Sequence, residues 1–502
     1  MAATLAISSA SWGCRTAGYR AADGSGGAAG DAPTGSGGTT TGSGGATATD
    51  DGGGTTDAMP IGTPCTNLAC NQSTCQTGAC TVPACAGGAR TTVSGIIHDP
   101  AGEVPLYNIT VYVPNKALDA IADGPSCDPC DPATGTSLLS GEPIAVTRTD
   151  VQGKFTLGAV PTMGGDVPAG DNIPLVIQVG KWRRQITVPH VDPCKDNPIS
   201  DADLLRLPRT QAEGHIPKMA LTTGEADALE CLLRKVGVAD SEFTPESGTG
   251  RINLFAGGGG STAYASTVNG GAAFTPVHPW WDSLDNLKKY DVILHACEGS
   301  QGTYDYQGYP TPLSVKSPEA LQALQDFADL GGRVFASHWH AYWFEKGTPA
   351  FQSIATFNHQ AGLPNPYDAT IETGFSTGQS LAQWMVNVGG STTLGTVTIA
   401  QTANTRMVES VAGGNTSQRW IYAPTLQPPS VQYLSATTPI PGGHCGRVVF
   451  SDLHVTSSAG AGSDQPKMPF PSGCVTTDLS PQEKVLEFML FDIASCVAPL
   501  VQ

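Results

Sequence analysis

Two different patterns of hydrophobic and polar positions occur along the chain after residue 88. Between residues 89 and 190, short runs alternate apolar and polar side chains and are rich in β-branched residues, as half-buried strands are. The turn at residues 99–102 (Asp-Pro-Ala-Gly) separates the first two runs by a short loop of the kind that closes a hairpin. Seven or so short strands predict a small β-sandwich. The expected strands are 91–97, 109–113, 144–148, 154–157, 173–179 and 184–188.

From residue 219 onward, strand-like runs alternate with helical periodicity. Ser317 and Pro318 are typical of a helix start, and Ser480 with Glu483 forms a capping box. Strands that alternate with helices at short spacing predict a flavodoxin-like parallel sheet covered on both faces. The expected helices are 224–235, 281–289, 317–330 and one from residue 480; the expected strands are 251–256, 290–295, 333–337, 419–422, 431–434 and 447–450.

The N-terminal part has the character of an export segment and a tether. Residues 1–14 bring small side chains up to Gly13 and Cys14, which is similar to the lipoprotein box at which bacteria attach lipid to cysteine. A basic start is missing, so we expect the natural start to lie upstream; the alternative is a cytosolic N-terminus with a chance cysteine. Residues 15–60 are almost wholly small and polar, and such a tract behaves as a flexible linker.

The charge and composition of the chain exclude some classes of binding partner. The net charge is −18 and the pI is about 4.8, so nucleic acid and anionic lipid headgroups would be repelled. No stretch approaches the roughly 20 apolar residues that cross a bilayer. We therefore expect no nucleic-acid partner and a membrane contact only through a lipid anchor. The expected location is outside the cytoplasm, at the outer membrane, in the periplasm or on the cell surface.

The chain has 14 cysteines, which favours an oxidising compartment. The segment 61–88 carries an even ladder of five with almost no apolar residues between them, so disulfides are favoured over a zinc site. The Cys127-Asp-Pro-Cys130 motif is interpreted as a structural clip rather than a redox dithiol. At least one further bridge is expected in the C-terminal part, and connectivity stays open. The disulfide candidates are Cys65, Cys70, Cys75, Cys80, Cys85, Cys127, Cys130, Cys445, Cys474 and Cys496.

A family resemblance covers nearly all of residues 89–190. The runs Val-Ser-Gly at 93–95, Asp-Pro-Ala-Gly at 99–102, Val-Tyr-Val at 111–113 and Thr-Asp-Val-Gln-Gly-Lys-Phe at 149–155 resemble the carboxypeptidase regulatory-like domain. The resemblance implies a transthyretin-like β-sandwich without catalytic residues, which acts as a spacer, stalk or binding module.

A second resemblance covers residues 219–502. The blocks 289–294, 321–338 and 446–454 resemble the class I glutamine-amidotransferase-like superfamily and its ThuA-like branch. That family carries a nucleophilic cysteine in an elbow after the strand that here ends at Ser337, where this chain has Ser-His-Trp-His. A histidine two residues before a glutamate is also missing, because His454 precedes Val455 and Thr456. Glutamine hydrolysis is therefore not expected.

Histidines and one carboxylate gather at expected strand ends. The carboxyl ends of strands in an open α/β sheet line the ligand crevice, and imidazole with carboxylate suits zinc with an open position for water. The alternative is that they are polar side chains of an inherited cleft. Cys297 is interpreted as buried or disulfide-linked, and the glycines at 257–260 as a flexible loop rather than a phosphate loop. The candidate zinc ligands are His295, His338, His340, Asp452 and His454.

Two functions remain open at this point. The favoured one is an exported, lipid-anchored envelope protein with a binding or structural role, whose amidotransferase-like domain lacks the catalytic cysteine. The alternative is a metal-assisted hydrolase that acts on a carbohydrate or another envelope component. Aromatic residues dense around 280–343 favour a carbohydrate ligand, because aromatic rings stack on sugars, although most aromatics are core residues.

Overall fold

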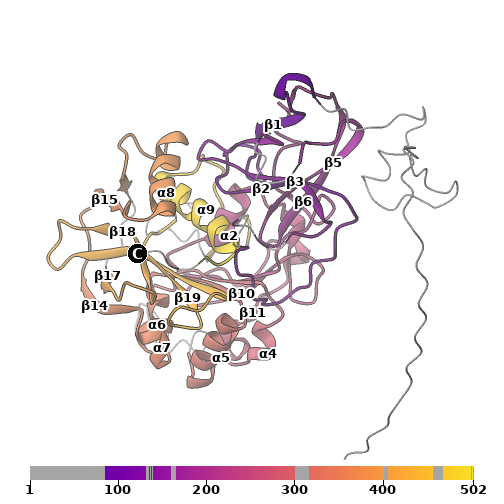
Figure 1. Ribbon diagram of the computed structural model, residues 1–502. Helices are drawn as coiled ribbons and strands as arrows, with labels where there is room; N and C mark the ends of the chain where they lie inside the picture. The colour runs from indigo at the N-terminus through magenta and orange to yellow at the C-terminus, as the bar shows by residue number, and fades with distance from the viewer. Residues whose placement is uncertain are drawn as a thin grey trace, which may run out of the picture. The chain divides into compact units, whose positions relative to one another are not determined.

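The computed structural model describes residues 85–131, 135, 137, 139–159, 165–299, 316–400, 405–455, 467–498 and 500 (Figure 1). Residues 1–84 lie outside this range, and with them the expected signal segment, the linker and most of the cysteine ladder. The cysteines concerned are Cys14, Cys65, Cys70, Cys75 and Cys80. Everything below concerns the unit that spans residues 64–502.

Seven strands form two sheets at the start of the described chain. One sheet has the order β4-β1-β7 and the other the order β3-β2-β5-β6. The hairpin expected between the first two runs is wrong, because β1 pairs with β4 and β7 whereas β2 pairs with β3 and β5. The strands are β1 (Thr92–Ile96), β2 (Thr110–Pro114), β3 (Pro143–Arg148), β4 (Lys154–Leu157), β5 (Gly170–Val179), β6 (Trp182–Val191) and β7 (Asp196–Pro198).

The turn before β4 shows why its residue types are needed. The Asp150 carboxylate accepts from the backbone N–H groups of Gln152 and Lys154, both at 2.9 Å. Gly153 has a φ of 72°, a left-handed conformation that glycine adopts without strain. The buried Thr149 hydroxyl donates to the Leu106 carbonyl at 2.6 Å. The turn therefore depends on side-chain hydrogen bonds that its sequence supplies.

The second part is built on one mixed sheet of thirteen strands. Its main path is β11-β10-β8-β12-β13-β20-β19-β18-β15-β16. The neighbours from β11 to β20 are all parallel, whereas the strands beyond β20 are antiparallel. The expected parallel sheet is therefore wrong for 419–422 and 431–434.

The bounds of these strands are as follows: β8 (Met219–Thr222), β9 (Phe243–Thr244), β10 (Ile252–Ala256), β11 (Thr275–Pro276), β12 (Val292–His295), β13 (Arg333–Ser337), β14 (Ala355–Ala361), β15 (Tyr367–Ile371), β16 (Thr396–Ile399), β17 (Thr405–Val411), β18 (Gln418–Ala423), β19 (Ser430–Thr438) and β20 (Gly446–Ser451).

Helices cover both faces of this sheet (Figure 1). Along β12, Val292 and Leu294 pack in the core that contains α2 and α9, while Ile293 packs in the core that contains α5. Burial on both faces is why these strands are continuously apolar. The helices are α2 (Leu229–Lys235), α3 (Val277–Trp280), α4 (Leu284–Leu287), α5 (Pro318–Asp329), α6 (Tyr342–Glu345), α7 (Pro349–Gln352), α8 (Ser376–Asn387) and α9 (Pro481–Ala494).

The expected helix starts at Ser317 and Ser480 are confirmed. Ser317 accepts from the Ala320 N–H, and Ser480 with Glu483 makes both bonds of a capping box. The helix expected at 224–235 instead begins at Leu229, which leaves residues 224–228 as a loop. Among the described residues, no helix combines the length and apolar character needed to cross a membrane.

The N-terminal sheets and the α/β part share one hydrophobic core. Tyr107 stacks on Phe488 of α9 with ring centroids 5.8 Å apart, and Trp182 of β6 meets Phe491 edge-on at the same distance. The Trp384 indole of α8 donates to the Pro105 carbonyl at 2.7 Å. Because α9 is buried by the sheet on one side and by these residues on the other, none of its residues is exposed.

Four disulfides cross-link the described residues. The Cys127-x-x-Cys130 motif is not closed on itself: Cys127 bonds to Cys445 and Cys130 to Cys496, with Cα atoms 4.1 and 4.9 Å apart. Both bridges join the loop between β2 and β3 to the α/β part. The other two are Cys85–Cys194 and Cys231–Cys474. Cys85 of the even ladder therefore pairs outside that ladder, and Cys194 and Cys231 are partners that sequence reasoning did not single out. These bridges are typical of an oxidising, extracytoplasmic environment.

Candidate metal centre

Three side chains from neighbouring strand ends converge at the carboxyl edge of the parallel strands. Cys297 lies two residues after β12, His338 directly follows β13, and His454 lies three residues after β20. These strands are adjacent and parallel, in the order β12-β13-β20. The carboxyl ends of such strands meet at the same edge of the sheet, so residues 157 positions apart come together.

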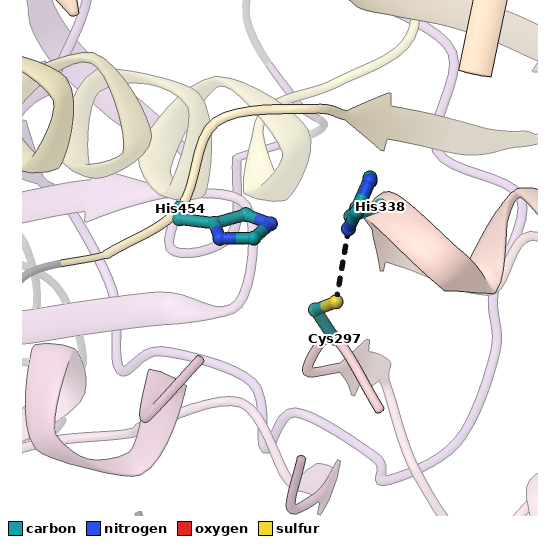
Figure 2. Close-up of side chains that lie close together, drawn as sticks. All are labelled: Cys297, His338 and His454. Atoms are coloured by element: carbon teal, nitrogen blue, oxygen red, sulfur yellow. Dashed lines mark hydrogen bonds between the residues drawn. The ribbon is translucent and has the colours of Figure 1, made fainter. Parts of the chain in front are cut away.

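Figure 2 shows the three side chains pointing toward one shared space. One ligand atom from each residue lies within 4.8 Å of the other two. The Sγ of Cys297 and the Nδ1 of His338 are 3.2 Å apart, and the ring centroids of His338 and His454 are 4.8 Å apart. Among the described residues, these three form a group of His, Cys, Asp or Glu side chains that lie close enough together to hold one metal ion.

His338 is held in one ring orientation and one tautomer. Its Nε2 lies 2.7 Å from the carbonyl oxygen of Thr405 at the start of β17, and a carbonyl only accepts. Nε2 therefore carries the proton, and Nδ1 offers its lone pair to Cys297. A metal-bound histidine is oriented in the same way, by donating its other ring N–H to a carbonyl or carboxylate. The backbone of His338 has a φ of 42°, a strained conformation that clusters at functional sites.

Burial keeps the thiol and the imidazole neutral. Cys297 and His338 are 0% and 3% exposed. Desolvation raises the pKa of the Cys297 thiol well above its ordinary range, and the nearby carboxylates of Asp227 and Glu298 add to this. Desolvation lowers the pKa of His338 well below its ordinary value, and the neighbouring His454 adds to that effect. A divalent cation would supply the positive charge that stabilises a thiolate here.

The donor set suits zinc. Thiolate and neutral imidazole are both common zinc ligands, and three protein ligands with a fourth position free are the arrangement of catalytic zinc sites. Bond lengths of about 2.0–2.3 Å place the ligand atoms of a tetrahedral ion about 3.3–3.6 Å apart. The Cys297–His338 pair is already near that separation, and the most distant ligand atom would move inward by roughly 1 Å. The Nε2 of His454 is buried without a hydrogen-bond partner among the described residues, so it is available as a ligand.

His295 and His340 do not join this group. They stack on each other with centroids 4.7 Å apart, and His295 also stacks on Trp343 at 5.1 Å. The Nε2 of His340 lies 3.8 Å from the Glu298 carboxylate, which forms a fully buried ion pair with Lys316 at 2.6 Å. Because His340 is two residues beyond His338 in a 3-10 turn (His338–Ala341), the two rings enter different surroundings. The expectation that both belong to one metal site is wrong.

Asp452 is also outside the group. Its Oδ2 accepts from the Met407 N–H of β17 at 3.2 Å, and burial raises its pKa to about 8. Its carboxylate is not among the side chains whose ligand atoms lie within 4.8 Å of one another. Of the five histidine and aspartate candidates, therefore, only His338 and His454 lie in the group that includes Cys297.

The third member, Cys297, was expected to be buried or disulfide-linked, and the structure confirms the burial but not a disulfide. It is buried but is the one free thiol among the described cysteines, and His338 contacts it. The available signal was its place after a strand adjacent to the one before His338. Gly224 allows the loop after β8 to lie against the Cys297 backbone, because a Cβ at position 224 would lie 2.2 Å from the Cys297 carbonyl oxygen.

Other residues considered for a ligand role have structural surroundings. Trp280, Trp281 and Trp343 are buried in the core, while Trp339 is half-buried beside His338 at 5.4 Å between centroids. Gly257 packs against the Thr223 carbonyl, and the Gly258 N–H donates to Glu298, so this turn is packed rather than an open phosphate cradle. Tyr304, Tyr306 and Tyr309 lie outside the described residues.

No protein-family model and no curated protein matches the chain. Among solved structures, it is similar to a cytoplasmic protein from Salmonella typhimurium, with 12% identity, a TM-score of 0.26, and 54% of this chain and 98% of that one covered. A second cytoplasmic protein, from Salmonella typhimurium LT2, has 12% identity, a TM-score of 0.27, and 49% and 91% coverage. A ThuA-like protein from Bacteroides uniformis has 10% identity, a TM-score of 0.25, and 47% and 82% coverage. Nothing about activity is transferred from these likenesses.

Proposed function

We propose that this chain is an exported cell-envelope protein whose α/β part is a metal-assisted hydrolase. The observation that carries the proposal is the convergence of Cys297, His338 and His454 within 4.8 Å. The sequence alone favoured a binding or structural role because the nucleophilic cysteine of the resembling family is missing from its elbow. The contact of Cys297 with His338 supports the alternative, because it adds a thiol to two of the candidate histidines.

Each residue of the centre has a distinct part in this chemistry. Cys297 and His338 form the preassembled half of the centre, with His338 fixed by Thr405. His454 is the more exposed of the three, so substrate would approach from its side. A zinc-like ion held by three protein ligands lowers the pKa of a water in the fourth position and so supplies a nucleophile at neutral pH. The substrate class we propose is a carbohydrate or another envelope component.

The fold assignments are part of this proposal. The order β10-β8-β12-β13-β20, all parallel, supports a flavodoxin-like core, in which ligands bind at the carboxyl ends of the strands. In an amidotransferase-like or ThuA-like domain, His338 would occupy the elbow where the family carries its cysteine. The two N-terminal sheets would be the carboxypeptidase regulatory-like sandwich, supported by the Thr149–Phe155 turn, and would act as a stalk.

Elemental analysis tests the centre directly. The disulfide-bonded protein should contain about one zinc ion per chain, and His338→Asn or Cys297→Ser should lower the content to a small fraction. Asparagine tolerates a left-handed backbone, so the first change removes the ligand with little strain. His444→Ala, at an exposed histidine, is the matched control and should keep the metal. Wild-type protein without metal, after growth with zinc, would refute the proposal.

Export and anchoring are a separate part of the proposal. The disulfides support an oxidising compartment, and Cys14 would carry the lipid. Wild-type protein should fractionate with membranes, whereas Cys14→Ser should be released into the soluble fraction. Recovery of the wild type in the cytosol with reduced cysteines would contradict this part and leave the metal centre standing.

A second candidate function is the binding of a polar ligand in a cavity away from the metal centre. A cavity of about 890 Å³ lies between the N-terminal sheets and the α/β part. Its lining is rich in charged and hydroxyl side chains, and cavities of this size at such junctions commonly hold ligands. Envelope carbohydrate that protects the protein thermally, equally in wild type and His338→Asn, would favour binding here over the metal centre. The lining includes Glu103, Arg234, Asp240, Thr476, Thr477 and Lys484.

A further inference from the structure

One loop touches the segments that carry all three proposed ligands. It comprises residues 224–227, between β8 and α2. β8 is the neighbour of β12 in the sheet, so the loop lies at the same carboxyl edge as the centre. The Ala226 N–H donates to the Cys297 carbonyl at 3.0 Å, which ties the loop to the first ligand segment.

The Asp227 side chain connects the loop to the other two segments. Its Oδ2 is hydrogen-bonded to the hydroxyl of Ser337, the residue directly before His338. Its Oδ1 accepts from the backbone N–H of Val455, the residue directly after His454, at 3.0 Å. Asp227 and Ser337 are both fully buried. One carboxylate therefore fixes the chain on either side of the two histidines.

We propose that Asp227 is the positioning residue of the centre, an inference that rests on the proposed function. It touches no ligand atom in the described structure. It acts by holding the turn that begins at His338 and the chain that leaves β20 at one separation, so that both imidazoles face Cys297. Partners of this kind, behind the ligands, affect metal affinity by about 10–100-fold when changed.

The geometry also indicates which property of Asp227 matters. Val455 needs an acceptor, and the Ser337 hydroxyl can either donate or accept. Asparagine at position 227 would serve both with its amide oxygen and nitrogen, whereas alanine would serve neither. A role in positioning therefore predicts that Asp227→Asn keeps much of the function and that Asp227→Ala loses it.

Cobalt(II) is the probe for the test, because a cysteine ligand gives it a near-ultraviolet charge-transfer band that a merely folded protein lacks. Full-length, disulfide-bonded protein is stripped of metal and titrated with cobalt(II). We expect Asp227→Ala to bind about 10–100-fold more weakly with an altered band, and Asp227→Asn to remain within about 10-fold of wild type with the wild-type band. Glu230→Gln, which changes a buried carboxyl of α2, is the matched control and should bind like the wild type.

Three results decide the matter. Wild-type affinity and spectrum in both Asp227→Ala and Ser337→Ala would overturn the role of Asp227 and leave the metal centre intact. No thiolate-to-cobalt band in wild type would overturn the metal centre and this inference together. If circular dichroism shows that Asp227→Ala does not fold, Ser337→Ala decides in its place: a weakened, shifted band supports the inference and an unchanged one refutes it.

Discussion

The Nδ1 of His338 faces the Sγ of Cys297 at 3.2 Å while its Nε2 faces the carbonyl oxygen of Thr405 at 2.7 Å. Both ring nitrogens are thus engaged, one by a side chain from the segment after β12 and the other by the backbone of β17. This arrangement makes His338 the centre of the site, and it comes with a left-handed backbone at that residue.

The backbone of His338 leads to a prediction about stability. With a φ of 42°, alanine is strained at this position, whereas glycine adopts the left-handed backbone without strain. In metal-free protein, His338→Gly should therefore be more stable than His338→Ala by roughly 1 kcal/mol. Urea unfolding followed by fluorescence measures the difference. Equal midpoints would mean that the turn relaxes out of this conformation when the imidazole is removed.

Gly224 is predicted to be indispensable for the position of Cys297. An added Cβ would lie 2.2 Å from the Cys297 carbonyl oxygen, so Gly224→Ala must push the loop and the cysteine apart. We expect a loss of about 1–3 kcal/mol in the free energy of unfolding together with weaker cobalt(II) binding. Gly165→Ala is the control, because its Cβ would meet nothing nearer than 3.7 Å. Unchanged metal affinity in Gly224→Ala would show that the cysteine does not depend on this contact.

Two buried carboxyl groups lead us to expect that the free energy of unfolding falls as pH rises. Asp99, beside β1, and Glu487 of α9 are both buried and interact with each other. Burial raises the pKa of Asp99 to about 6 and that of Glu487 well above its ordinary value, which Lys484 partly offsets. Because these pKa values are raised in the folded protein, the stability is highest below about pH 4. It falls as pH rises through about 6, where Asp99 ionises, and falls further where Glu487 ionises.

The variant Glu487→Gln, which has an amide in place of one carboxyl group, separates the contribution of Glu487 from that of other titrating groups. Glu487→Gln needs no proton, so its free energy of unfolding should change less between pH 4 and pH 8 than that of the wild type. Glu319→Gln, at an exposed carboxyl of α5, should follow the wild-type curve. Urea unfolding at a series of pH values measures this. Parallel curves for wild type and Glu487→Gln would contradict the prediction.

The long-range disulfides should stabilise the fold without contributing to the centre. Cys130–Cys496 closes a segment of 366 residues, and cross-links over long segments restrict the unfolded chain most. Replacing both cysteines by serine should lower the free energy of unfolding by about 2–5 kcal/mol and leave the metal content unchanged. Guanidinium unfolding and elemental analysis of the same preparation measure both. A drop in metal content at unchanged stability would reverse this assignment.

Local sequence determined the elements whose signals are short-range. The helix starts at Ser317 and Ser480 are set by side chains that bond to backbone three residues away, and the buried strand 333–337 is set by its apolar run between glycines and a turn. The tight turn at Asp150 and Gly153 belongs to the same class. Such features follow from neighbours within a few positions, so a sequence is enough to predict them.

Tertiary structure alone decided which strands pair and which side chains meet. Nothing in the turn at Asp99 shows that β1 and β2 belong to different sheets, and nothing near Cys130 identifies Cys496 as its partner. The sequence placed His338, His340 and Asp452 at strand ends, but a 3-10 turn and a backbone contact send the last two into other surroundings. Cys297 gained its role only because β12 and β13 are neighbours and Asp227 holds the adjoining loops. Pairing over hundreds of residues depends on the whole packed core, and the composition of any one segment does not record it.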